Sequence, residues 1–176
     1  LIFTIIFTLI VGGTLTFHAA YYTRFIIIGQ SMYPTLNIEA KDSEGNLLGE
    51  EYSGNYLNDF VVEYGIVDTH LDINKLERFD IVAFYTTSSK YSKIVKRVIG
   101  FPNENIKYDS VGQLFVNDVK VDESLDDKYL KETGIVNTHL GDNEYDLLGD
   151  NRANSDDSRN KGDYTSDLFI AKLVAI

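Results

Sequence analysis

A serine and a lysine are the residues of this chain best suited to nucleophilic chemistry. Ser31 lies in a turn-like run over residues 29–36, and Lys96 lies 65 residues later in an apolar run over residues 94–100. A serine hydroxyl is a weak nucleophile at its normal pKa and needs a partner base. A lysine amine can serve as that base when burial removes its charge. The two residues therefore predict a Ser–Lys pair that works without histidine.

The alternation of residue types around Lys96 favours a buried amine. In a strand, Ile94, Lys96 and Val98 share one face, whereas Arg97 points to the other. The aliphatic neighbours would desolvate the amine, and the charge of Arg97 would be paired elsewhere. Each half of the pair also has an ordinary reading, because Ser31 suits a turn and Lys96 suits an edge strand that resists aggregation.

A third polar run lies near the C-terminus. Residues 149–152 read Gly-Asp-Asn-Arg, and residues 155–159 read Ser-Asp-Asp-Ser-Arg. The spacing of the acidic residues does not fit an EF-hand calcium loop. The chain has no cysteine, which excludes thiol catalysis and Cys-based zinc sites, and its three histidines are far apart in the sequence. We expect neither a metal nor another cofactor.

The acidic composition restricts the partners. The net charge is −11, from 27 acidic and 16 basic residues. Nucleic-acid binding needs clustered lysine and arginine, so we expect no nucleic-acid partner. Attachment to a lipid bilayer would have to come from apolar insertion rather than from attraction to anionic lipid.

Residues 1–23 supply such an apolar segment. They carry no fixed charge, and about 20 apolar residues are enough for a helix to cross a bilayer. Tyr21, Tyr22 and Arg24 follow where an interfacial belt would lie. The segment predicts one N-terminal transmembrane helix, with a cleaved signal peptide and a buried helix as the alternatives.

Residues 24–176 are typical of one mainly β domain built from antiparallel sheets. Residues 37–76 form a polar, turn-rich excursion with room for one hairpin, and residues 122–132 suit a short helix. Asn117-Asp118 suits a two-residue hairpin turn. Short apolar or alternating runs predict strands over residues 25–28, 80–85, 92–99, 113–116, 119–121, 145–148 and 168–176.

Taken together and in order, the motifs resemble those of bacterial type I signal peptidases of the Gram-positive kind. The resemblance rests on residues 31–35, 78–82, 96–100 and 149–159, all downstream of an apolar segment. It implies that Ser31 is the nucleophile and Lys96 the general base. It also implies that the catalytic domain lies outside the cytoplasm, anchored to the cell membrane by one span.

The resemblance assigns supporting roles as well. Ser155 would orient the lysine amine. Two structural ion pairs, Arg97–Asp150 and Asp157–Arg159, would hold the backbone around the site in place. The oxyanion hole would use the Ser31 backbone N–H, since Gly29 stands where some relatives carry a hydroxyl. The substrate would add as a strand along residues that include Ile28, Gly29, Met32, Ile94 and Val95.

Three departures from the family pattern concern loops. Phe79 replaces a usual glycine, Asn103-Glu104 replaces a Gly-Asp turn, and the gap between nucleophile and base is long. None of them changes a catalytic position.

The function implied is removal of N-terminal signal peptides from exported preproteins. The partners implied are those signal peptides, the lipid bilayer and the translocation machinery. The alternatives are a self-cleaving repressor-type Ser–Lys peptidase, a non-catalytic assembly factor such as one for pili, and a specialised processing peptidase. A repressor would need a DNA-binding module, and a non-catalytic factor would be expected to lack Ser31 or Lys96.

Overall fold

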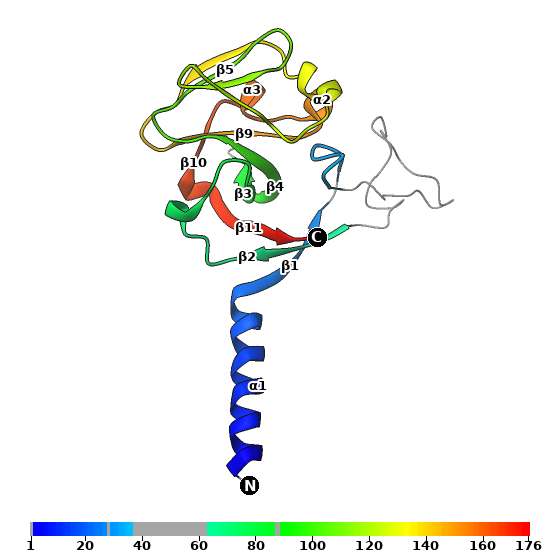
Figure 1. Cartoon of the computed structure of the whole chain (residues 1–176), viewed down its shortest axis with the longest axis vertical. Coiled ribbons are helices and arrows are strands. Elements are labelled where there is room, and N and C mark those ends of the chain that lie inside the picture. Colours follow the sequence, from blue (N-terminus) through cyan, green and yellow to red (C-terminus); the bar gives the residue numbers. More distant parts are fainter. Residues whose placement is uncertain (1, 28, 37–62, 87–88) are drawn as a thin grey trace, which may run out of the picture.

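A computed structural model describes residues 2–27, 29–36, 63–86 and 89–176 (Figure 1). Helix α1 projects from one end of a β-rich body. The helices of the described residues are α1 (Ile2–Tyr21), α2 (Asp127–Lys131) and α3 (Ser158–Lys161), with short 3₁₀ turns η1 (Ile73–Lys75), η2 (Arg152–Asn154) and η3 (Ser166–Leu168). The strands are β1 (Tyr22–Ile27), β2 (Glu63–Asp68), β3 (Ile81–Thr86), β4 (Ser89–Gly100), β5 (Asn105–Tyr108), β6 (Leu114–Val116), β7 (Val119–Val121), β8 (Val136–His139), β9 (Glu144–Leu148), β10 (Tyr164–Thr165) and β11 (Phe169–Ala175).

A seven-stranded antiparallel sheet forms the larger layer, in the order β1-β2-β11-β3-β4-β9-β10. The C-terminal strand β11 lies between β2 and β3, so it joins the two halves of the sheet. Strand β4 is central, pairing with β3 on one side and with β9 on the other. This mainly β, antiparallel architecture confirms the predicted fold class.

A four-stranded antiparallel sheet, in the order β7-β6-β5-β8, makes the second layer. Figure 1 shows it at the end of the molecule away from α1. The predicted hairpin turn is present, because Asn117 and Asp118 have φ values of 51° and 63° and join β6 to β7. Both residues tolerate positive φ, as this kind of two-residue turn requires. The core of this sheet continues into β4 and β9 through Ile99 and Leu148.

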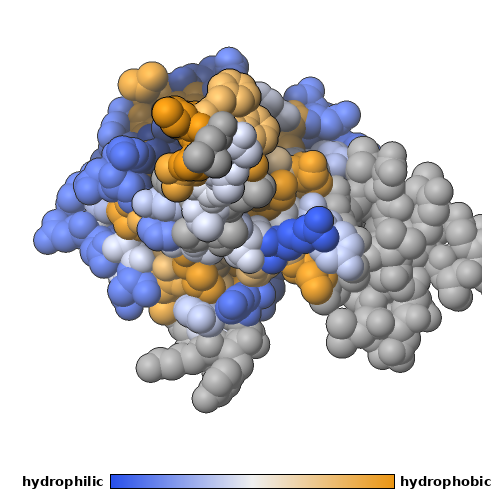
Figure 2. Space-filling view, turned by 90° about the horizontal axis from the view of Figure 1, so that it is seen from below, coloured by the Kyte–Doolittle hydropathy of each residue, from blue (hydrophilic) through white to orange (hydrophobic). Residues whose placement is uncertain are grey.

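Helix α1 runs straight into β1 without an intervening loop. Strand β1 begins at Tyr22, and the division into an anchor over residues 1–23 and a β domain over residues 24–176 stays a prediction. Many of the apolar side chains of α1 are exposed, and Phe3 is 82% exposed. Viewed from the α1 end, Figure 2 shows further apolar side chains on the surface around the helix. Within the described part of the chain, no helix meets the length and hydropathy expected of a membrane span.

The predicted excursion over residues 37–76 contains a strand whose position the sequence pattern did not indicate. Strand β2 lies inside it and pairs with β1 and β11. Gly65 sits in the middle of this strand, where an added Cβ would come within 2.5 Å of the Leu173 side chain. Glycine weakens the strand signal in a sequence, but here it permits a close approach. Residues 37–62 lie outside the described residues.

Two of the departures from the family pattern occur at backbone positions that favour glycine. Phe79 has φ of 76°, and Asn103 has φ of 65°. The left-handed region is costly for a residue with a bulky side chain, and less so for asparagine. The chain thus keeps the backbone conformation that suits glycine at both turns, and the backbone of Phe79 is strained as a result.

Candidate active site

Ser31 and Lys96 meet at one site. Ser31 lies in a turn after β1, and Lys96 lies in the middle of β4. Lys96 Nζ donates a hydrogen bond of 2.7 Å to Ser31 Oγ and another, of 3.1 Å, to the Val95 carbonyl. Only 3% of Lys96 is exposed. The structure therefore brings together the two residues that the sequence predicted to react.

The environment of Lys96 favours the neutral amine. Burial lowers the pKa of Lys96 from 10.5 to about 8, against the opposing attraction of Asp157, Asp156 and Asp150. Desolvation disfavours the charged form, and nearby carboxylates restore only part of the loss. A lysine with this pKa is partly deprotonated near neutral pH, as a general base must be.

A cleft of about 150 Å³ opens beside the pair. One wall is the end of β1, and the other is the segment of β4 around Lys96. Of the predicted substrate-binding residues, Gly29, Met32, Ile94 and Val95 line this cleft. Ile28 lies outside the described residues. Its walls are formed by strands, which are the elements that an extended peptide can pair with.

Arg97 points away from Lys96 and is paired, as predicted. Its Nε donates a hydrogen bond of 2.7 Å to Asp150, and its Nη1 donates one of 2.8 Å to the Phe79 carbonyl. Asp150 is fully buried. The alternating geometry of β4 thus places a base on one face and an anchored cation on the other.

The second predicted ion pair is also present. Arg159 Nε and Nη2 donate to the Asp157 carboxylate at 2.8 Å and 2.9 Å. Burial alone would raise the pKa of the Asp157 carboxyl, but the hydrogen bonds from Arg159 outweigh it and hold the pKa below its ordinary value. Asp157 therefore stays ionised, and its charge acts on the neighbouring Lys96.

The turn Gly149–Asn151 supports the nucleophile from behind. The Asn151 N–H donates a hydrogen bond of 3.1 Å to the Ser31 carbonyl, and the Gly149 N–H donates one of 3.0 Å to Asp157. A Cβ on Gly149 would lie 2.4 Å from the Ser31 carbonyl oxygen. Only glycine allows this close approach, so the turn fixes the backbone of Ser31 by direct contact.

Ser155 lies beside this turn but is not hydrogen-bonded to Lys96. It is buried, and a Cβ on Gly149 would come within 2.1 Å of its hydroxyl oxygen. That oxygen makes no well-formed hydrogen bond among the described residues, but it lies near Asp157 and helps to hold down the pKa of that carboxyl. The orienting role of Ser155 stays a prediction.

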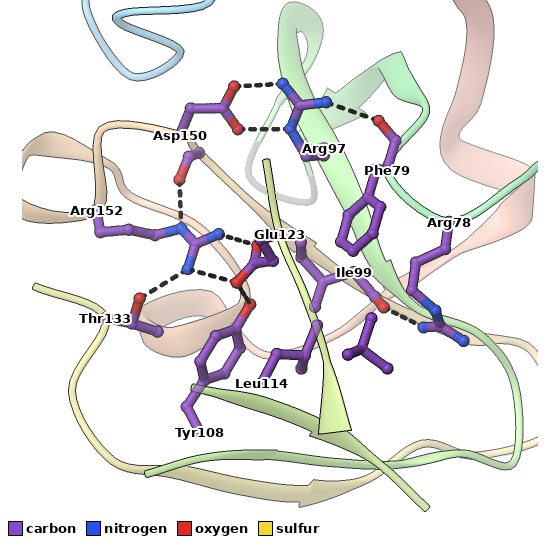
Figure 3. Close-up of polar contacts among 12 residues, drawn as sticks. Arg78, Phe79, Arg97, Ile99, Tyr108, Leu114, Glu123, Thr133, Asp150 and Arg152 are labelled. Carbon is purple, nitrogen blue, oxygen red and sulfur yellow. Dashed lines mark hydrogen bonds and ion pairs between the residues drawn. The ribbon is translucent and has the colours of Figure 1, made fainter. Parts of the chain in front are cut away.

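Sequence reasoning missed a buried network behind the turn (Figure 3). Arg152 is fully buried and pairs with Glu123, which also accepts a hydrogen bond of 2.7 Å from the Tyr108 hydroxyl. Glu123 lies just after β7 of the four-stranded sheet, and Tyr108 lies in β5 of the same sheet. They lie 29 and 44 residues before Arg152, and no local pattern links positions so far apart. Within the described residues, no group of acidic, histidine or cysteine side chains could hold a metal ion.

The fold and the comparisons with known proteins define the class, a serine endopeptidase. A family described as "Signal peptidase, peptidase S26" matches residues 1–176. Signal peptidase I U of Bacillus subtilis is 34% identical over 155 residues, covering 82% of this chain and 69% of the relative. Signal peptidase I S of the same organism is 30% identical over 164 residues, covering 88% and 73%.

A solved structure agrees with these relatives. A signal peptidase I from Enterococcus faecalis superposes with a TM-score of 0.50 at 28% identity, covering 57% of this chain and 97% of that one. The chain belongs to the signal peptidase family, peptidase S26.

Proposed function

We propose that this protein removes N-terminal signal peptides from exported preproteins, with Ser31 as nucleophile and Lys96 as general base. The observation that carries the proposal is the 2.7 Å contact between Lys96 Nζ and Ser31 Oγ at the floor of the cleft. Family membership supports the same reaction. A histidine is not needed, because burial brings the pKa of Lys96 to about 8.

The substrate binds as an extended strand between β1 and β4. Backbone hydrogen bonds supply affinity, and alternate side chains of the peptide face the cleft. The apolar walls include Met32, Ile94 and Val95, and the cleft is only about 150 Å³ in volume. Small apolar side chains, such as alanines one and three residues before the scissile bond, fit such a space.

The reaction proceeds through an acyl-enzyme. Neutral Lys96 takes the proton of Ser31 Oγ as the oxygen attacks the scissile carbonyl, and the resulting ammonium gives that proton to the leaving amine. A water molecule then attacks the ester, with Lys96 again as base, and the serine is restored. The developing oxyanion is stabilised by the Ser31 backbone N–H, because Gly29 offers no side-chain donor. For Ser155 to hold the lysine amine in line during both steps, its hydroxyl must turn toward Lys96 when the substrate binds, because it makes no hydrogen bond to that amine in this structure.

Residues 1–23 attach the protein to the cell membrane, with the catalytic domain on the outer side. Support comes from α1, which carries no charged residue and exposes Ile2, Phe3, Phe7 and Leu9 by 60% or more. Attachment would place enzyme and substrate on one surface and raise their effective concentration. The signal peptide, the bilayer and the translocation machinery are the partners in this arrangement.

The test uses the detergent-solubilised protein and a preprotein with an Ala-x-Ala cleavage site. Wild type is expected to cut at that site, whereas Ser31→Ala and Lys96→Ala are expected to lose at least about a thousandfold in rate. Ser110→Ala and Lys107→Ala, both at exposed positions, serve as matched controls and should cut normally. Cleavage by either dyad variant at the wild-type rate would refute the mechanism. No cleavage by wild type would favour a non-catalytic assembly role.

A further inference from the structure

A buried ion pair connects the small sheet to the catalytic turn. The side chain of Arg152 is 0% exposed and that of Glu123 is 2% exposed. The guanidinium lies over the Tyr108 ring at 5.3 Å, and the Tyr108 hydroxyl in turn donates a hydrogen bond to Glu123. Figure 3 shows Glu123 between the two. Because both charges are removed from water, each depends on the other for compensation.

The same guanidinium reaches the turn behind the nucleophile. Arg152 Nε donates a hydrogen bond of 3.0 Å to the Gly149 carbonyl, and its Nη1 donates one of 2.7 Å to Thr133 Oγ1. Gly149 begins the turn whose Asn151 N–H holds the Ser31 carbonyl. A displacement of Arg152 would therefore be transmitted to the backbone of Ser31 through two hydrogen bonds.

We propose that Glu123 is a positioning residue for the Ser31–Lys96 pair. It fixes Arg152, and Arg152 fixes the Gly149–Asn151 turn on which the nucleophile rests. The inference depends on the proposed function, because a positioning role has meaning only for a site that reacts. Such a role would connect the four-stranded sheet to catalysis, although that sheet contributes none of the residues that line the cleft.

The chain offers a matched control in a second ion pair. Arg78 Nη2 lies 2.6 Å from Glu104 Oε1, with side chains 22% and 18% exposed. Like Glu123, Glu104 is a carboxylate paired with an arginine, but the hydrogen bonds of this pair go to Ile99 and Phe101 and not to the Gly149–Asn151 turn. Glu104→Gln removes a similar charge without touching the nucleophile.

The kinetic test compares Glu123→Gln with Glu104→Gln at a temperature where both are folded by circular dichroism. Glu123→Gln is expected to lower kcat at least about tenfold, because a displacement near 1 Å can cost as much as a hundredfold. KM should stay within about twofold, since no network residue lines the cleft. Glu104→Gln should keep kcat within about twofold, and Glu123→Asp, which keeps the charge, should recover part of the loss.

Hydrogen exchange of the Asn151 amide tests the coupling without relying on activity. This amide should exchange faster in Glu123→Gln than in wild type or Glu104→Gln, because its acceptor, the Ser31 carbonyl, is no longer held in place. Equal exchange in the two glutamine variants, or a fall in kcat of the same size in both, would overturn the inference. If wild type does not cut preproteins, the proposed function fails, and the exchange result alone then decides the coupling.

Discussion

The proposed mechanism depends on one buried lysine, Lys96. Three carboxylates, Asp157, Asp156 and Asp150, raise the pKa of Lys96, while burial lowers it further than they restore it. The balance leaves the amine with a pKa of about 8. A fully apolar pocket would lower the pKa of Lys96 further and make its amine a weaker base. The carboxylates therefore set how strong a base Lys96 can be.

The pH dependence of cleavage follows from this balance. Only the neutral amine can accept the serine proton, so kcat/KM should rise with pH through a midpoint near 8, the pKa of Lys96 in the free enzyme. Asp156→Asn removes one of the charges that raise the pKa, and should move the midpoint to lower pH. Asp156 is exposed and pairs with Lys161, so the fold should tolerate the change.

Initial rates from pH 6 to 10 check this expectation. Asp122→Asn, which breaks an exposed pair with Lys120, is the matched control and should leave the midpoint unchanged. A midpoint that stays fixed in Asp156→Asn, or a rate that falls as the pH rises through 8, would contradict the assignment of Lys96 as the base.

The residues of the proposed site were predictable from the sequence because short motifs carry them. Ser31, Lys96, Arg97 and Asp150 each belong to a local run, and alternation along one strand separates the base from the arginine. Glu123 was not predictable in this way. Its role depends on Arg152 across two sheets, and only the folded chain brings them together.

At the scale of elements, turns and strand order position these groups. The strands with clear alternation, such as β3 and β4, were predicted to within a few residues. Strand β2 was not, because Gly65 interrupts its pattern and its partners lie far away in the sequence. The prediction from sequence therefore succeeded where the periodicity is local and failed where a tertiary contact selects the residue.

The turn before β3 provides a test of strain at this scale. Phe79 has φ of 76°, and its carbonyl accepts a hydrogen bond from Arg97. Both substitutions lose the packing of the Phe79 ring against the core of the four-stranded sheet. Glycine also relieves the backbone strain, whereas alanine does not, so Phe79→Gly should be more stable than Phe79→Ala by about 1 kcal/mol.

Urea unfolding of the two variants measures this difference. Lys107→Gly and Lys107→Ala, in the regular strand β5, form the control pair and should show the opposite order. If the alanine variant is the more stable one at both positions, the positive φ at Phe79 carries no strain.

For the whole molecule, the position of the cleft relative to α1 is fixed by a rigid connection. The Thr69 N–H donates a hydrogen bond of 3.1 Å to the carbonyl of Tyr21, the last residue of the helix. The Tyr21 ring stacks on His70 at 4.0 Å. Strand β1 then spans about 20 Å to the cleft, as six extended residues do. The distance between helix and active site is thus set by the fold.

A flexible insertion at this junction tests whether that distance matters. Gly-Ser-Gly-Ser placed between Tyr21 and Tyr22 should slow cleavage of preproteins presented in lipid vesicles. Cleavage of a short soluble peptide should be unchanged, because the cleft itself is intact. The same insertion between Asn117 and Asp118 is the control and should affect neither substrate. Equal slowing of both substrates by the junction insertion would instead indicate damage to the site.

The order of the strands also divides the larger sheet between the two residues of the proposed dyad. Ser31 follows β1, which pairs with β2, whereas Lys96 lies in β4, which pairs with β3. Strand β11 lies between β2 and β3, so the backbone hydrogen bonds that connect the two parts of the sheet pass through it. Loss of β11 pairing would leave Ser31 and Lys96 held together only by the contacts around the site itself, such as the bond from Asn151 to the Ser31 carbonyl.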